Sequence, residues 1–187
     1  MAERARANLK EFANVDVVAE RFEEIEGAFG LVTCAQVYHW LDRETRVQRF
    51  HDLLRSGGTA AIVANVQVNP EYNLPFWVRV NDVYREITPG MEHQGEFRKP
   101  DDLPAHPFEE SKLFERLDLA KHFWEWTLST EDYAGLLATH SNKAALDEHT
   151  RARLIDAISE LVDSEFDGHV TECYVAVAYL ASRPAGR

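Results

Sequence analysis

Cysteine is scarce in this 187-residue sequence, which also lacks clustered basic residues and long hydrophobic runs. The only two cysteines, Cys34 and Cys173, are far apart in the chain, and each lies inside an apolar run. A disulfide framework is typical of small secreted chains with several patterned cysteines. We therefore predict two buried free thiols and no disulfide.

The charge balance is acidic, with 20 basic and 32 acidic residues and a formal net charge of −12. Nucleic acids and anionic membrane surfaces are bound by clustered Lys and Arg, so neither is expected as the main partner. The first six residues have no apolar core like that of a signal peptide, and the longest apolar runs are only as long as strands. These absences predict a cytoplasmic protein without a membrane association.

Several functional motifs are also missing. No G-x-G segment occurs, and the single glycine pair, Gly57-Gly58, follows a predicted helix, where it is expected to end that helix. The eight histidines show no H-x-H, H-x-x-x-H or H-E-x-x-H spacing, which argues against a metal site. Without G-x-S-x-G the nucleophile elbow of an α/β-hydrolase is absent. No internal repeat, low-complexity tract or linker to a second domain is apparent.

The most informative stretch spans residues 29–66. An apolar strand is predicted over 31–35, a helix from Arg43, and a second strand over 59–66. Asp42 is placed to cap the helix and Gly57 to close it. A helix of this length between two buried strands is the crossover of a βαβ unit, which pairs the strands in parallel. The fold class is therefore α/β. The apolar face of the helix consists of Val47, Phe50, Leu53 and Leu54.

The segments on either side are predicted in less detail. A short helix is expected over 2–12 and a strand over 14–19. After residue 66, a helix with Pro75 in its first turn runs to Ile87. Its Trp77 and Tyr84 are interpreted as packing residues, with substrate contact as the alternative. A long connection, 91–107, follows.

The C-terminal part is predicted to begin with an aromatic strand around 123–127. Ser129 and Asp132 then form a pair like a capping box at the start of a helix. A longer helix spans about 147–166, and the last strand covers 170–181.

Two motifs in the first half carry a family resemblance. The pattern Phe29-x-Leu31-Val32 followed by Ala35-Gln36-x-Tyr38-His39-Trp40-x-Asp42, and then Leu54-Arg55-x-Gly57-Gly58, resembles the fourth and fifth strands of class I S-adenosyl-L-methionine-dependent methyltransferases, most closely the type 11 branch. Leu128-Ser-Thr-Glu-Asp-Tyr133 and Thr139-x-Ser141 resemble the C-terminal part of the same branch. Gly30 replaces the usual Asp of that branch, and Ser56 replaces its usual Pro.

The resemblance implies a Rossmann-like methyltransferase sheet that is mostly parallel and ends in an antiparallel hairpin made by the last two strands. The chain is expected to be one domain over 1–187. Residues 1–68 would form the remaining βαβ core, residues 69–112 a cap on the acceptor side, and residues 113–187 the C-terminal strands and helices.

The resemblance also implies a site for S-adenosyl-L-methionine and a small-molecule acceptor. Phe22 and Glu23 would lie just past the strand 14–19 and line the adenine pocket, while Ala35 and Gln36 would approach the cofactor at the end of the next strand. His39 is the candidate general base. The alternative is a structural histidine that packs beside Trp40.

The family pattern begins in the middle of the fold. Its first strand, its glycine-rich loop and its second strand, which carries the ribose-binding acid, have no counterpart in the sequence. We expect either a start further upstream, which the position of Met1 favours, or a remnant domain. The first hypothesis is a small-molecule methyltransferase that is incomplete at its cofactor site. The second is a non-catalytic, methyltransferase-like interaction module that associates with itself or another chain through an exposed sheet edge.

Overall fold

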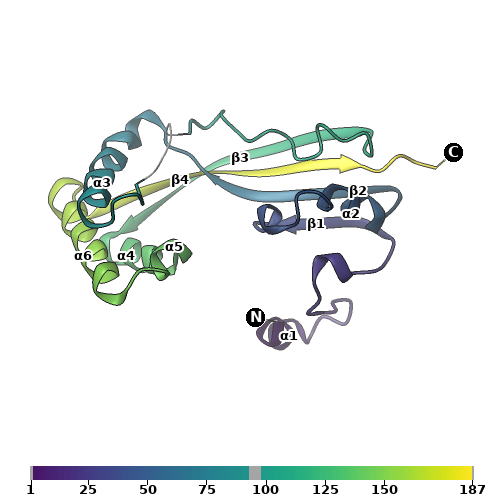
Figure 1. The fold of residues 1–187 in the computed structure, drawn as a ribbon, viewed down its shortest axis with the longest axis horizontal. Coiled ribbons are helices and arrows are strands. Elements are labelled where there is room, and N and C mark those ends of the chain that lie inside the picture. Colours follow the sequence, from purple (N-terminus) through teal and green to yellow (C-terminus); the bar gives the residue numbers. More distant parts are fainter. Residues whose placement is uncertain (1, 93–97, 187) are drawn as a thin grey trace. The chain divides into compact units, whose positions relative to one another are not determined.

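The computed structural model describes residues 2–92 and 98–186, and the strands among them form one sheet with the order β1-β2-β4-β3 (Figure 1). Helices alternate with the first strands along the chain, as expected for an α/β protein. The predicted α/β, Rossmann-like sheet is therefore confirmed. Its strands are β1 (Phe29–Ala35), β2 (Leu54–Gln67), β3 (Arg116–Ser129) and β4 (His169–Ser182).

The strand directions also follow the prediction. β1 and β2 are parallel, whereas the neighbouring strands β3 and β4 run in opposite directions (Figure 1). The connection between β3 and β4 is long, because it contains three helices. The last two strands are thus antiparallel neighbours, but they are not joined by a tight turn.

The chain divides into two compact units. Unit 1 comprises residues 2–63, 106–119 and 179–186, and unit 2 comprises residues 64–92, 98–105 and 120–178 of the described chain. β2, β3 and β4 each contribute residues to both units. The expected single domain over 1–187 stays a prediction.

Unit 1 is built on the parallel pair and on helix α2 (Arg46–Leu53). The ring of Phe50, on the buried face of α2, is fully buried, and so is that of Phe108 from the segment after residue 105. Their centroids are 5.7 Å apart. We call these two rings and their neighbours the aromatic cluster. Its other members are Phe22, Tyr38 and Phe114.

The glycine pair shapes the entry to β2. Helix α2 ends at Leu53, and Gly57 lies beyond it in the left-handed region with φ +70°. A Cβ on Gly58 would lie 2.9 Å from the carbonyl oxygens of Arg55 and Phe29, so only glycine fits there. The pairing register of β1 and β2 shifts at this point. The pair therefore forms an irregularity at the start of a strand rather than the expected turn directly after the helix.

The N-terminal prediction is wrong in part. Helix α1 (Ala2–Leu9) forms but ends before residue 12, and residues 14–19 are irregular instead of a strand. No described strand lies beside this segment, and Val15 and Val18 are 43% and 56% exposed. A strand needs a partner for its backbone groups and a covered face, so β-propensity alone does not order it.

Unit 2 contains a helical layer with its own core. Its helices are α3 (Leu74–Ile87), α4 (Thr130–Thr139), α5 (Ser141–Ala144) and α6 (Glu148–Glu165). Ser129 accepts a hydrogen bond from the N–H of Asp132, which confirms the predicted cap, and Asp147 caps α6 in the same way. α6 packs against α3 and α4 through a buried stripe: Leu154, Ile158, Leu161 and Val162. Short 3₁₀ turns complete the chain: η1 (Phe22–Glu24), η2 (Tyr38–Trp40) and η3 (Glu71–Asn73).

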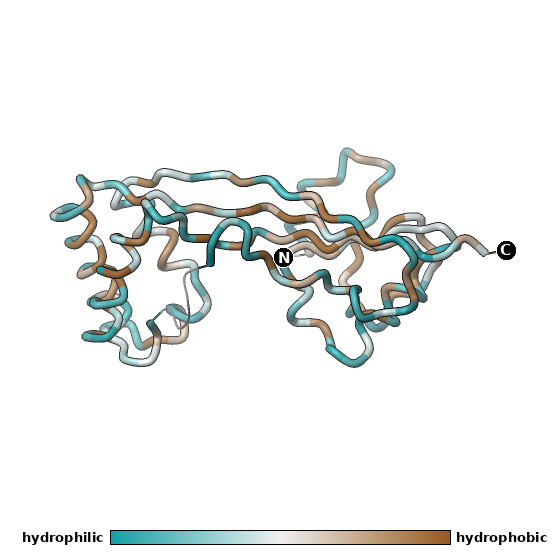
Figure 2. The backbone as a smooth tube through the Cα atoms, turned by 90° about the horizontal axis from the view of Figure 1, so that it is seen from above, coloured by the Kyte–Doolittle hydropathy of each residue, from teal (hydrophilic) through white to brown (hydrophobic). Residues whose placement is uncertain are grey.

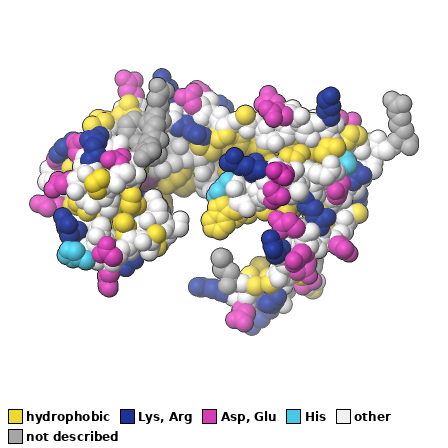
Figure 3. All heavy atoms as spheres, in the orientation of Figure 1, with side chains coloured by type: hydrophobic (Ala, Val, Ile, Leu, Met, Phe, Trp, Pro, Cys, Tyr) yellow, Lys and Arg dark blue, Asp and Glu magenta, His cyan; other side chains and the backbone are white. Residues whose placement is uncertain are grey.

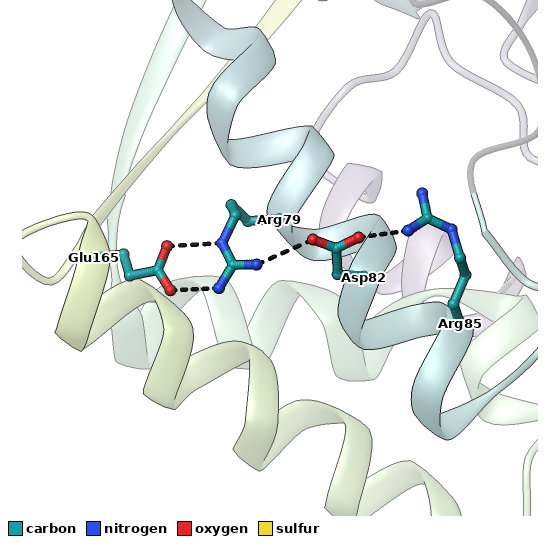
Figure 4. Close-up of polar contacts among 4 residues, drawn as sticks. All are labelled: Arg79, Asp82, Arg85 and Glu165. Carbon is teal, nitrogen blue, oxygen red and sulfur yellow. Dashed lines mark hydrogen bonds and ion pairs between the residues drawn. The ribbon is translucent and has the colours of Figure 1, made fainter.

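A surface ion-pair network ties α3 to α6 (Figure 4). The Arg79 guanidinium donates in a two-pronged arrangement to Glu165, with Nε to Oε2 at 2.8 Å and Nη2 to Oε1 at 2.6 Å. Asp82 then bridges Arg79 and Arg85. The Arg79 contact keeps the pKa of the Glu165 carboxyl below its usual value. Because all four groups are solvent-exposed, the network contributes more to helix orientation than to stability.

The distribution of charged side chains and the state of the two cysteines agree with the predictions from the sequence. Hydrophobic residues concentrate along the strands (Figure 2), and Lys and Arg side chains are interspersed with Asp and Glu on the face drawn in Figure 3. Cys34 and Cys173 are both buried free thiols, as predicted. Within residues 2–92 and 98–186, no helix has the length and apolar character needed to cross a bilayer.

Candidate functional site

The first candidate location is the carboxyl end of β1, where the sequence places cofactor contacts. Ala35 ends the strand, and Gln36 takes the left-handed conformation with φ +63°, uncommon for a residue other than glycine. The Gln36 N–H donates to the carbonyl oxygen of Val63 at 2.9 Å, which anchors this turn to β2. Both residues are exposed. In parallel sheets, ligands bind outside the carboxyl ends of strands, so this backbone turn is open to such a ligand.

The candidate general base lies in the next turn, η2. His39 is exposed, and its ring meets that of Trp40 edge to face, with centroids 5.8 Å apart. Trp40 is itself 78% exposed, so this pair is not part of the core. Because the pair is exposed, His39 is accessible from solvent, as a general base would need to be. Its ring contact with Trp40 is the one expected if His39 is a structural histidine. The role of His39 stays a prediction.

Tyr38, in the same turn, packs into the aromatic cluster. The guanidinium carbon of Arg46 lies 4.1 Å from the centre of its ring, and Arg46 Nη1 donates to the Tyr38 carbonyl oxygen at 3.0 Å. The Tyr38 hydroxyl is buried and makes no well-formed hydrogen bond with the described residues. Burial raises the pKa of this phenol, although the Arg46 charge opposes the shift. The turn after β1 is therefore fixed by packing and by one arginine.

The predicted adenine-side residues are placed differently from the expectation. Phe22 and Glu23 lie in η1, which follows an irregular segment because the strand 14–19 does not form. The Phe22 ring packs against Phe50 with centroids 4.9 Å apart. Glu23 is exposed and lies 3.6 Å from Arg21. Phe22 is thus held by the aromatic cluster, and Glu23 is open to solvent.

The second candidate location is a cavity of about 260 Å³ in unit 2, which the sequence did not reveal. Side chains from α3, α4 and α5 and from β4 line it. Trp77 and Tyr84 of α3 are buried in the helical core, which confirms their packing role, and they also face this cavity. The cavity differs from an ordinary packing defect because its walls carry two buried charged residues, Glu172 and Lys143.

Glu172 lies on β4 and is 2% exposed. Gln67 Nε2 donates to its Oε2 at 2.6 Å, and the hydroxyls of Tyr133 and Tyr174 also donate to the carboxylate. Burial nevertheless dominates and raises the pKa of Glu172. Burial, together with the same carboxylate, raises the pKa of Tyr84 to about 12. Three neutral donors satisfy part of the acceptor capacity of a carboxylate, which can accept about four hydrogen bonds.

Lys143 supplies the opposite charge from α5. Its residue is 6% exposed, its Nζ lies 3.3 Å from Nδ1 of His140, and the ammonium lies 5.4 Å from the centre of the Tyr84 ring. Burial lowers the pKa of Lys143, and Glu172 works against that shift. Burial and the Lys143 charge lower the pKa of His140, which leaves its ring neutral and able to accept from the ammonium. No direct ion pair joins Lys143 and Glu172, both of which are described residues.

One of these residues carried a signal in the sequence. Glu172 is a charged residue inside the apolar run 170–181, which is the predicted last strand, and a carboxylate that such a strand buries needs partners. Lys143 gave no such signal, since it lies in a polar segment. Among the described residues, no group of three or more His, Cys, Asp and Glu is placed to hold a metal ion.

Comparison with solved structures identifies the fold. BH2331 of Bacillus halodurans C-125, described as a candidate methyltransferase, is similar with a TM-score of 0.51 and 21% identity, over 98% of this chain and 79% of that one. YcgJ of Bacillus subtilis is similar with a TM-score of 0.53 and 16% identity, over 100% of this chain and 79% of that one. The chain therefore has a Rossmann-like methyltransferase fold. Neither a scan of protein-family models nor a search of curated proteins finds a match.

Proposed function

We propose that this chain is an S-adenosylmethionine-dependent methyltransferase domain that acts on a small molecule, with a cofactor pocket that its 187 residues form only in part. One observation carries the proposal. The chain shares its fold with BH2331, and within that fold an open, left-handed turn follows β1 at Gln36. The carboxyl end of such a strand is where a nucleotide-type cofactor meets a parallel sheet.

The residues at this turn fit one side of such a cofactor. Ala35 and Gln36 are exposed, and Phe22 offers a half-buried ring that packs against Phe50 of α2. The sequence has no G-x-G segment to surround the methionine part. When bound, the cofactor would supply a methyl group on a sulfonium, and the protein would mainly hold the acceptor in line with it.

The first test is calorimetric titration of S-adenosylhomocysteine into the folded chain. We expect weak binding or none. A Kd of about 1 μM, equivalent to roughly −8.2 kcal/mol, would overturn the idea of an incomplete pocket. Size-exclusion chromatography and circular dichroism would establish beforehand that the chain is folded and monodisperse.

A chimera tests the methyltransferase assignment itself. The first two strands and the glycine-rich loop of a class I methyltransferase with measured cofactor affinity would be joined ahead of this chain. We expect the chimera to bind S-adenosylhomocysteine, Ala35→Trp to abolish that binding by filling the end of β1, and Ala152→Trp, at an exposed position of α6, to leave it unchanged. A folded chimera without affinity, or one insensitive to Ala35→Trp, would refute a cofactor site at this turn.

The same chimera tests the role of His39. If His39 is the general base, His39→Ala removes turnover and keeps cofactor affinity, because the side chain lies outside the core. If His39 has only a packing role, His39→Phe, which retains the ring contact with Trp40, should have the same turnover and cofactor affinity as the unsubstituted chimera. Unchanged turnover in His39→Ala would reject the catalytic role.

A second candidate function is a non-catalytic interaction module, and the open edge of the sheet favours it. Among the described strands β1 pairs only with β2, and its Leu31 is 58% exposed. An apolar edge strand is a template for pairing with another chain. We expect self-association in light scattering if this function holds, and Leu31→Lys to abolish it. A monomer at all concentrations would refute association of the chain with itself.

A further inference from the structure

The cavity of unit 2 has both polar and apolar walls, and its polar residues include Gln67, Glu92, His140 and Asn142. The Glu172 carboxylate and the Lys143 ammonium are its buried charges, and Trp77, Met91 and Leu137 contribute hydrophobic surface. Charged side chains are rarely buried unless they are paired. Among residues 2–92 and 98–186 neither side chain forms an ion pair: Gln67 donates to the Glu172 carboxylate, and the Lys143 ammonium contacts His140.

Burying a charge without a counter-ion is costly, and the two charges do not form an ion pair that would offset this cost. A ligand can supply both missing counter-ions. A positively charged group on the ligand would satisfy the remaining acceptor capacity of Glu172. A negatively charged group would accept hydrogen bonds from the Lys143 ammonium, which has three N–H donors and directs one of them to His140. A ligand with only one charge would leave the other buried side chain without a counter-ion.

The size of the cavity limits the ligand. A cavity of roughly 150 Å³ is large enough to bind benzene, so about 260 Å³ admits a moderately larger molecule. That volume fits a metabolite of the size of an amino acid.

We propose that the cavity of unit 2 binds a small molecule that carries an amine and a carboxylate, with the ammonium at Glu172, the carboxylate at Lys143, and an apolar part against Trp77 and Leu137. The binding is a property of unit 2 alone. That the bound molecule is the methyl acceptor rests on the proposed function.

The test uses the complete chain and requires no cofactor. The probes are ω-amino acids of increasing chain length, beginning with β-alanine, each compared with the alkylamine and the carboxylic acid of the same carbon skeleton. We expect the best ω-amino acid to bind at least about 10-fold tighter than either counterpart, a difference of roughly 1.4 kcal/mol. Equal affinity for a probe with one charge, or no saturable binding across the series, overturns the proposal.

Two variants assign the ends of the ligand. Lys143→Met should remove the preference for the amino acid over the amine, and Glu172→Gln should remove its preference over the carboxylic acid. Lys121→Met and Glu160→Gln make the same chemical changes at exposed positions of unit 2 and should change neither preference. If Lys143→Met and Glu172→Gln lose both preferences together while remaining folded, the assigned orientation is wrong.

The comparison of probes on the unsubstituted chain stands even if a variant does not fold. Its outcome is also separate from that of the cofactor titration. Binding of amino acids without binding of S-adenosylhomocysteine supports the cavity and leaves the cofactor pocket incomplete, whereas the reverse pattern refutes the cavity and retains the methyltransferase assignment.

Discussion

The aromatic cluster of unit 1 makes a quantitative prediction about the turn that follows β1. Phe50 is 0% exposed and lies between the rings of Phe22, Tyr38 and Phe108, with centroid distances of 4.9, 6.1 and 5.7 Å. Replacing a fully buried Phe by Ala removes its hydrophobic transfer energy and leaves a cavity, which together cost about 3–5 kcal/mol. Loss of the ring contacts places Phe50→Ala toward the upper end of that range.

The loss is large compared with the total stability of a domain, about 5–15 kcal/mol. For a chain of this size, roughly 2–4 °C of Tm correspond to 1 kcal/mol, so we expect Phe50→Ala to lower Tm by about 6–20 °C. The matched control is Phe12→Ala, because Phe12 is 56% exposed. It should change the free energy of unfolding by no more than about 0.5 kcal/mol.

Hydrogen exchange would locate the effect, since two compact units need not unfold in one step. Amides of β1 and of the β1-facing part of β2 should lose protection in Phe50→Ala, because α2 loses its buried anchor. If Phe50→Ala unfolds with the same free energy as Phe12→Ala, the ring is not a core residue and the account of this turn fails.

Three further predictions concern single groups. Gln36→Val should lower the free energy of unfolding in urea by about 1–2 kcal/mol, because a β-branched residue tolerates a φ of +63° poorly, whereas Gln36→Gly should be neutral to within about 1 kcal/mol; equal effects would contradict the left-handed turn. Ser129→Ala should cost about 1 kcal/mol through loss of the α4 cap, and Ser129→Asp should retain the stability if the cap is real. Glu172 has a raised pKa in the folded protein, so the folded state holds its proton more tightly than the unfolded state does. Its contribution to stability therefore falls as pH rises from the ordinary value of 4.5 through the raised pKa, and Glu172→Gln should remove this fall in pH-dependent thermal unfolding; a parallel pH profile would refute the burial of the carboxylate.

Local sequence signals predicted the elements whose stabilising contacts lie close in the chain. The apolar face of α2, with Phe50 and Leu53, and the cap at Ser129 act within a few residues of the helix that they specify, and both are found in the structure. The predicted cap at Asp42 is wrong, because α2 begins at Arg46 with Thr45 at its N-cap. The β1–α2–β2 crossover follows from chirality and length, which are also local properties. The strand predicted over 14–19 failed for the opposite reason. Its valines favour extended backbone, but a strand forms only where a neighbour pairs with it.

The two candidate sites also differ in whether residues close in the sequence specify them. Ala35, Gln36 and His39 could be placed because they lie at the end of a strand or within a few residues of it, and the end of a parallel strand has a known direction in the sheet.

The cavity of unit 2 could not be predicted in this way, since Gln67, Lys143 and Glu172 come from three separate elements that only the packed helices bring together. Glu172 alone broke a local rule, as a carboxylate within an apolar strand. A buried charge that serves no local structure has to be satisfied by distant groups or by a ligand. For this reason Glu172 is the residue whose position in the sequence most directly indicates the cavity of unit 2.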